Sequence, residues 1–171
     1  RIQAQNFLKQ YSSKFLVGIN LEGAVEGKKI RFPELYQICE GLYRKDKNIQ
    51  IIIFSAPNNF QDISQKVKKM ALCYVEMSYK TDKILAVAAL ISQLDLIVTP
   101  DTSIVHIASA FNKPIVTIHE DNRDSYELFA PTSKLNRTVF SKSKNSLNGF
   151  SIGLLLSACF ELINLIKKGR S

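Results

Sequence analysis

The chain has 171 residues, of which 46% are hydrophobic and 22% charged, and this length is typical of one globular domain. No run approaches the ~20 apolar residues of a membrane-spanning helix, which excludes an integral membrane protein held by helices. The three cysteines lie far apart without a CxxC pair, which excludes a disulfide scaffold and a cysteine-rich zinc site and favours a reducing, cytoplasmic setting. The net charge of +8 favours anionic partners such as nucleotides, nucleic acid or an acidic membrane surface.

Residues 1–14 are mostly polar, lack the apolar core of a signal peptide and do not begin with Met. We expect them to form an interdomain linker or a helix. We also expect the chain to be a fragment or a processed product.

Short apolar runs alternate with helical patterns along the rest of the chain, which is typical of a parallel sheet covered by helices. Six runs are rich in β-branched and aromatic residues and too short for buried helices, so we expect strands at Phe15–Leu21, Ile49–Ser55, Leu72–Met77, Leu96–Thr99, Pro114–His119 and Arg137–Phe140. Residues 15–171 should therefore form a Rossmann-like domain with a doubly wound, parallel six-stranded sheet. In such a sheet the ligand binds outside the carboxyl ends of the strands.

Helices are expected between these strands, placed by their caps and by apolar residues at helical spacing. The first runs from about Pro33 to Lys47. The second is capped by Asn58 or Asn59, and the third by Thr81 with Ile84 turned inward.

Two further helices complete the pattern. The fourth runs from Thr102 to Phe111, which ends its apolar stripe. The last, from about Asn148 to Lys168, carries apolar residues beyond its core face at Leu154, Phe160 and Leu165. We expect a second domain or a partner to cover this surplus.

Three common catalytic fingerprints are absent. The chain has no GxGxxG, no GxxxxGK[ST] and no GxSxG. A nicotinamide-dependent enzyme, a P-loop nucleotidase and a serine hydrolase therefore lose their main support in the sequence.

The segment from Leu94 to His119 combines a buried strand, a tight turn and a helix that begins at the carboxyl edge of the sheet. The free amides of that helix and the hydroxyls of Thr102 and Ser103 favour a bound pyrophosphate. His106 lies three residues after Ser103 and should face the same opening. The alternative is that Asp101, Thr102 and Ser103 are ordinary helix caps and His106 is a surface residue.

This segment resembles the most recognisable stretch of the family nine glycosyltransferases, the heptosyltransferases. The matching positions are Asp95, Asp101, Thr102, His106, Ala108, Ala110 and Pro114. Weaker similarity extends from about Phe15 to Lys168, and Phe32-Pro33 matches the Trp-Pro with which a helix of the family begins.

The resemblance implies the C-terminal, donor-binding half of a GT-B fold, whose two Rossmann-like domains face each other across a cleft. It implies inverting transfer of heptose from ADP-heptose to the inner core of lipopolysaccharide, without a metal, another cofactor or a nucleic-acid partner. The setting would be the bacterial cytoplasm, and peripheral contact with the inner membrane is a further option.

The resemblance also implies roles for individual residues. Asp101 would contact the heptose, Thr102 and Ser103 would hold the diphosphate, and His106 would support that site. The basic loop residues Lys28 and Lys29 are further candidates for donor binding. The general base of the family lies in the acceptor-binding N-terminal domain, so we expect no catalytic residue in these 171 residues and no activity from them alone.

The chain departs from the family at several positions. Ser103 replaces a glycine, His119-Glu120 replaces Phe-Gly, and Asn58 and Asn59 lie where a carboxylate is expected after the second strand. Three alternatives therefore stay open. The chain is a degenerate, non-catalytic binding module, it uses another nucleotide sugar, or it belongs to an epimerase-like enzyme whose acid and base would be found among Glu120, Asp121 and His119.

Overall fold

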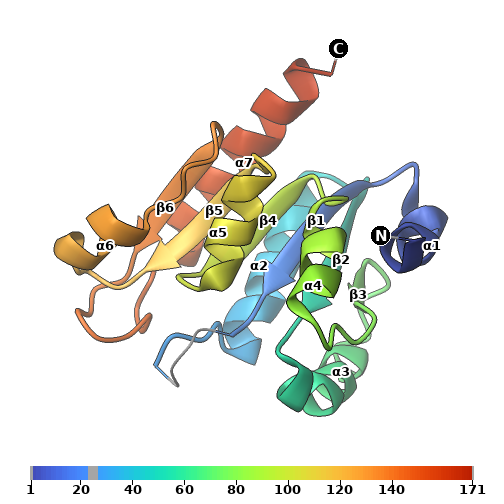
Figure 1. Ribbon diagram of the computed structural model, residues 1–171, viewed down its shortest axis with the longest axis horizontal. Helices are drawn as coiled ribbons and strands as arrows, with labels where there is room; N and C mark the ends of the chain where they lie inside the picture. Colours follow the sequence, from blue (N-terminus) through green and yellow to red (C-terminus); the bar gives the residue numbers. More distant parts are fainter. Residues whose placement is uncertain (1, 23–26, 171) are drawn as a thin grey trace.

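The computed structural model describes residues 2–22 and 27–170. Their strands form a six-stranded parallel sheet in the order β3-β2-β1-β4-β5-β6 (Figure 1). The strands are β1 (Phe15–Asn20), β2 (Ile49–Phe54), β3 (Val75–Met77), β4 (Leu96–Pro100), β5 (Ile115–His119) and β6 (Asn136–Phe140). This is the strand order of a doubly wound Rossmann-like sheet, so the predicted fold class is confirmed.

The direction of chain winding reverses next to β1. This strand pairs with β2 on one side and β4 on the other, so Val17 lies between Ile51 and Leu96. From β1 the chain moves outward to β2 and β3 and then returns across the sheet to β4. The loops after β1 and β4 therefore leave in opposite directions, and a crevice opens outside the carboxyl ends of these strands.

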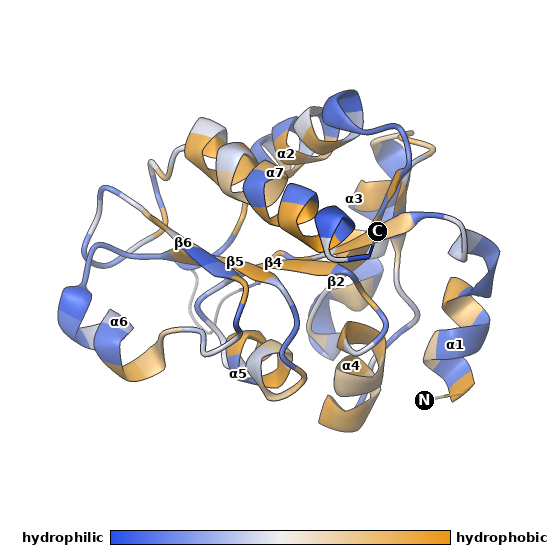
Figure 2. Ribbon diagram, turned by 90° about the horizontal axis from the view of Figure 1, so that it is seen from above, coloured by the Kyte–Doolittle hydropathy of each residue, from blue (hydrophilic) through white to orange (hydrophobic). Residues whose placement is uncertain are grey.

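The helices cover both faces of the sheet (Figure 2). They are α1 (Ile2–Leu8), α2 (Phe32–Lys45), α3 (Phe60–Lys69), α4 (Ile84–Ile91), α5 (Ser103–Ala110), α6 (Arg123–Phe129) and α7 (Ile152–Lys168), with short 3-10 turns at Lys9–Tyr11 and Pro57–Asn59. Helices α2, α3 and α7 lie on one face, and α4 and α5 lie on the other. Helices α1 and α6 lie at opposite ends of the molecule (Figure 1). No helix in the described ranges is long and apolar enough to cross a membrane.

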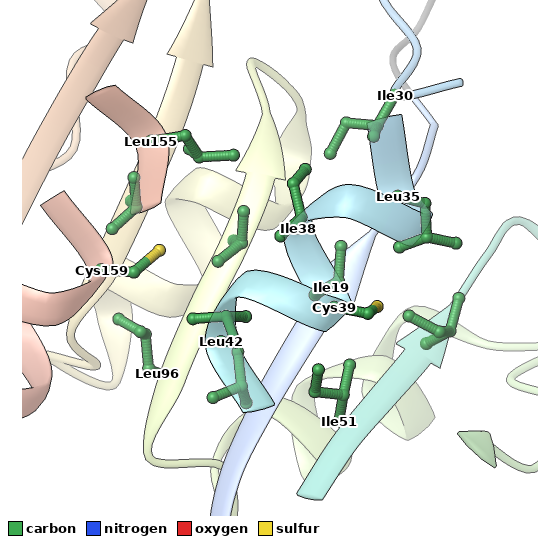
Figure 3. Packing of buried hydrophobic residues seen from close by; sticks show 14 of the residues in the cluster. Ile19, Ile30, Leu35, Ile38, Cys39, Leu42, Ile51, Leu96, Leu155 and Cys159 are labelled. Atoms are coloured by element: carbon green, nitrogen blue, oxygen red, sulfur yellow. The ribbon is translucent and has the colours of Figure 1, made fainter. Parts of the chain in front are cut away.

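Each face of the sheet has its own apolar core, which explains why the strands read as continuous apolar runs. On one face Ile19 and Leu96 pack against Ile38 of α2 and against Leu155 and Cys159 of α7 (Figure 3). The opposite core consists of residues from the strands, α1, α4 and α5: Leu8, Leu16, Ile52, Phe54, Leu90, Ile91, Leu94, Ile97, Ile104, Val105, Ala108 and Ile115. Both faces of the sheet are therefore buried by helices.

The start of α4 differs from the sequence-based expectation. The helix begins at Ile84 after Lys83, whereas Thr81 lies buried upstream and makes no cap. Ile84 was expected in the core but is 58% exposed. It is the first residue of the helix, whereas the buried residues Leu90 and Ile91 lie at the other end.

The end of α5 and the start of α7 also differ. Helix α5 ends at Ala110 because Asn112 adopts a left-handed conformation, with φ of 49°. Phe111 therefore leaves the predicted stripe and is 48% exposed. Helix α7 starts at Ile152 rather than near Asn148, because Gly149 has φ of 77° and cannot continue a helix.

Candidate functional site

The ends of β1 and β4 are joined at the point where the winding reverses. The side-chain amide of Asn20 donates to Thr99 Oγ1 at 3.1 Å and to the carbonyl oxygen of Glu22 at 2.9 Å. Both Asn20 and Thr99 are buried. The crevice between these strands therefore has a rigid polar floor.

The N-terminus of α5 lies directly above this floor. Thr102 Oγ1 accepts a hydrogen bond from the amide of Ile104 at 3.2 Å and lies 3.5 Å from Thr99 Oγ1. Thr102 is thus the helix cap, while Ser103 is exposed on the first turn. A negative group beside Ser103 would meet the positive end of the helix dipole.

A pocket of about 360 Å³ opens beside this helix end. Its lining consists of the ends of β1 and β2 and the first turns of α4 and α5: Asn20, Glu22, Phe54, Ser55, Ala56, Pro57, Ile84, Val87, Thr102, Ser103 and Ile104. The apolar part of the lining consists of Phe54, Ala56, Pro57, Ile84, Val87 and Ile104, whereas Ser55, Thr102 and Ser103 supply hydroxyls. Such a pocket suits a ligand with a flat apolar ring and an anionic group.

Glu22 is a site residue that the sequence analysis missed. Its carboxylate accepts hydrogen bonds from the amide of Ala56, at 2.6 Å, and from the side chain of Asn59. Asn59 precedes α3 but uses its amide for this contact instead of capping the helix. An acid thus lies beside the end of β2, although the loop after β1 supplies it.

A charged cluster occupies the carboxyl ends of β4 and β5. Lys28 Nζ lies 3.1 Å from Glu120 Oε1 and 3.9 Å from Asp101 Oδ2. His119 Nδ1 lies 3.8 Å from the same Asp101 oxygen. Glu120 is 8% exposed, so the ammonium group of Lys28 compensates a carboxylate that has lost most of its water.

His119 lies at the end of β5, inside an aromatic cage. Its ring contacts Tyr126 edge to face at 5.1 Å between centroids, and Phe140 lies 6.3 Å away. Burial lowers the pKa of His119; Asp101 and Glu120 oppose this shift, and Lys28 adds to it. The imidazole is therefore neutral near pH 7, and its Nε2 makes no hydrogen bond within the part of the chain that the structure describes.

The other predicted site residues lie further out. His106 is exposed on α5, and its ring lies 6.2 Å from that of Phe129 on α6. It does not line the 360 Å³ pocket. Lys29 lines a separate hollow of about 570 Å³ on the α2 side, together with Arg31. Asp121 is half exposed and lies 4.0 Å from Arg123.

The structure thus gathers the predicted residues in two groups. Thr102 and Ser103 line the pocket, and Lys28 and Asp101 belong to the charged cluster beside it. In the described ranges, no group of three or more His, Cys, Asp and Glu side chains is arranged to hold a metal ion.

A strand-order reversal with a helix N-terminus above it is typical of a Rossmann-like nucleotide-binding domain. The family model of glycosyltransferase family 9 (heptosyltransferase) matches residues 31–151, well over half of the chain. The chain belongs to this family, and the resemblance noted from its sequence is confirmed. No curated protein sequence matches it.

Solved structures share the fold at low sequence identity. A glycosyl transferase family 9 protein from Veillonella parvula aligns with a TM-score of 0.79 and 16% identity, over 94% of this chain and 50% of its own. E. coli ADP-heptose lps heptosyltransferase II aligns with a TM-score of 0.73 and 16% identity, and the alignment covers 100% of this chain and 53% of the E. coli protein. E. coli heptosyltransferase WaaC with ADP aligns with a TM-score of 0.69 and 21% identity, and the alignment covers 93% of this chain and 48% of the E. coli protein. The chain therefore spans about half the length of the proteins it resembles.

Proposed function

We propose that the chain is the donor-binding, C-terminal half of a glycosyltransferase that transfers heptose, with inversion, from ADP-heptose to the inner core of lipopolysaccharide. The observation that carries the proposal is the N-terminus of α5, which lies at the strand-order reversal and beside an apolar pocket. The family match supports transferase chemistry, and the names of the similar E. coli proteins support the choice of heptose.

The proposed donor pose follows from the chemistry of the pocket wall. The adenine ring would lie against Pro57 and Val87, and the diphosphate would lie on the first turn of α5, near Ser103. Asp101 is an acid, so it would accept hydrogen bonds from sugar hydroxyls rather than approach the phosphates. Lys28 lies between Asp101 and Glu120 and would bring a positive charge to the same region.

The contribution of this domain to catalysis would be electrostatic. Negative charge builds on the departing ADP, and the fixed dipoles of α5 and the ammonium group of Lys28 would stabilise it without reorganisation. We assign no general base to these residues and expect it in the acceptor-binding half of a complete enzyme. The proposed reaction needs no metal.

The proposed setting is the bacterial cytoplasm at the inner face of the inner membrane. In support, Cys39, Cys73 and Cys159 are all unpaired, as is usual in a reducing compartment.

A second candidate function is a non-catalytic binding module. The pairing of Lys28 with Glu120 favours this second function, because the ammonium group of Lys28 is then engaged by a carboxylate instead of a phosphate. Binding measurements separate the two functions, since a module retained only for assembly has no need to bind nucleotides.

A thermal-shift panel of ADP, UDP, GDP and ADP-heptose against the 171-residue chain tests the proposal. Ligands that bind only the folded state raise the melting temperature, and we expect ADP-heptose to raise it most, followed by ADP. Ser103→Glu should abolish both shifts by placing a negative charge at the helix end, whereas Ser157→Glu on the exposed side of α7 should leave them intact. No shift with any of the four ligands would favour the binding module.

A further inference from the structure

The charged cluster at the carboxyl ends of β4 and β5 holds more negative than positive charge. The ammonium group of Lys28 lies 3.1 Å from the carboxylate of Glu120 and 3.9 Å from that of Asp101. The imidazole of His119, which lies 3.8 Å from Asp101, is neutral near pH 7 because burial lowers its pKa. One ammonium group therefore faces two carboxylates, and the cluster keeps one negative charge in excess.

The excess charge comes from Glu120. Asp101 is one of the positions that match the family, whereas Glu120 stands where the family has a glycine. With a glycine there, Lys28 and Asp101 would form a balanced pair. The second carboxylate is thus particular to this chain, and the donor contacts proposed above make no use of it.

The backbone at the end of β5 holds Glu120 in place. The carbonyl oxygen of Glu120 accepts a hydrogen bond from the amide of Asn122 at 2.8 Å, and that of His119 accepts one from the amide of Ser141 at 2.7 Å. Glu120 is only 8% exposed. Its carboxylate therefore has little freedom to turn away from an anion that approaches Lys28, and water and salt screen its charge weakly.

The charge of a sugar nucleotide changes when the sugar leaves. In a nucleoside diphosphate sugar the terminal phosphate is esterified and carries one negative charge. In the free nucleoside diphosphate the same phosphate carries about 1.5 to 2 negative charges near pH 7. In the proposed pose this phosphate lies between Ser103 and Asp101, on the side of the charged cluster. The added charge therefore appears near Lys28 and Glu120.

We propose that Glu120 is a specificity-determining residue that favours a nucleoside diphosphate sugar over the free nucleoside diphosphate, an inference that rests on the proposed function. Lys28 and the amides of α5 attract both ligands. The carboxylate of Glu120 repels the additional charge that only the free diphosphate carries. The site therefore retains the donor and releases the nucleotide product more readily, which limits inhibition by that product.

Three ligands separate the effect of charge from the effect of the sugar. ADP-heptose carries the sugar and an esterified terminal phosphate. The methyl ester of ADP on its terminal phosphate carries the same charge without the sugar, and ADP carries the free terminal phosphate. Isothermal titration gives the Kd of each ligand for the unmodified chain and for each variant.

The ratio of the Kd of ADP to the Kd of its methyl ester reports on Glu120. We expect Glu120→Gln to lower this ratio by about fivefold, because it removes the charge that acts against the free terminal phosphate. Glu120→Gly, which introduces the family's residue at this position, should lower the ratio by a similar factor. Glu127→Gln removes an equal charge from the exposed side of α6 and should leave the ratio unchanged.

Two results would overturn the inference while leaving the proposed function intact. The first is binding with the same ratio in the unmodified chain and both Glu120 variants, which includes an equal weakening of ADP and its ester and would make Glu120 only an anchor for Lys28. The second is a change in Glu127→Gln as large as that in Glu120→Gln. Failure of the unmodified chain to bind any of the three ligands would overturn the proposed function, and the inference with it. Circular dichroism checks that each variant is folded.

Discussion

Lys28 and Glu120, which are 92 residues apart in the sequence, form an ion pair of 3.1 Å across the carboxyl edge of the sheet. The pair joins the loop before α2 to the end of β5. It also places the ammonium group of Lys28 beside Asp101, so the charge of the proposed donor site depends on a contact between distant segments.

The Lys28–Glu120 pair should influence the titration of His119. Lys28 helps burial to lower the pKa of His119, so Lys28→Met should raise it. The chain contains only two histidines, and a His106→Gln variant assigns the signal in an NMR titration. An unchanged or lower pKa of His119 in Lys28→Met would show that the cation does not act on this ring.

The neutral state of His119 should also make stability depend on pH. Because the pKa is lower in the folded state, the unfolded chain binds a proton first as the pH falls. Stability from this residue is therefore present above pH ~6.5 and is lost progressively below it. His119→Phe keeps an aromatic ring against Tyr126 and Phe140 and should flatten this part of the stability profile. Denaturant titrations between pH 5 and 8 measure the free energy of unfolding of both proteins. Parallel pH profiles for the unmodified chain and His119→Phe would contradict a neutral His119 in the folded state.

The fold class could be predicted because the physical signal is strong. Strands buried on both faces read as apolar runs, and α/β alternation leaves few topologies. Helix α6 was missed because none of its residues is buried, so it has no apolar stripe to detect. The exposure of Phe111 was missed because α5 ends at Ala110, ahead of the left-handed Asn112, whereas the spacing of apolar residues extended the helix to Phe111.

The sequence predicted only those parts of the candidate site whose residues are neighbours in the chain. Thr102 and Ser103 follow from a strand, a turn and a helix that are adjacent in the sequence. The contact between Glu22 and Ala56, like that between Lys28 and Glu120, joins loops whose separation is set by the completed sheet. No spacing within the sequence encodes such pairs.

The centre of β1 should tolerate no additional methyl group. A Cβ at Gly18 would lie 3.1 Å from a ring carbon of Phe54 and closer still to Leu94. Gly18→Ala should therefore lower the free energy of unfolding by about 1–3 kcal/mol. Gly153→Ala, at an open helical position on α7, should raise it by about 0.5–1 kcal/mol. Urea titrations compare the two, and equal effects of both substitutions would contradict the packing described for β1.

The outer side of α7 should mediate association. Leu154 is 62% exposed and Leu165 is 41% exposed, and three helical turns place both on one side. Phe160, which was also expected there, instead packs partly against the core, with Lys45 5.7 Å above its ring. We expect the 171-residue chain to self-associate through this stripe, or to bury it against a further domain. Light scattering should show a larger species that Leu154→Glu/Leu165→Glu converts to monomer. A strict monomer before substitution would contradict self-association.

The role of Asp101 is the most direct test of the proposed donor site. Isothermal titration of the unmodified chain and Asp101→Ala with ADP and with ADP-heptose compares a ligand lacking the sugar with one carrying it. If Asp101 accepts hydrogen bonds from the sugar, the substitution should weaken ADP-heptose binding by roughly 1–3 kcal/mol and leave ADP binding unchanged or slightly tighter. An equal loss for both ligands, accompanied by a drop in stability of about 1 kcal/mol, would instead identify Asp101 as a structural residue of the α5 turn and would contradict the donor-site assignment.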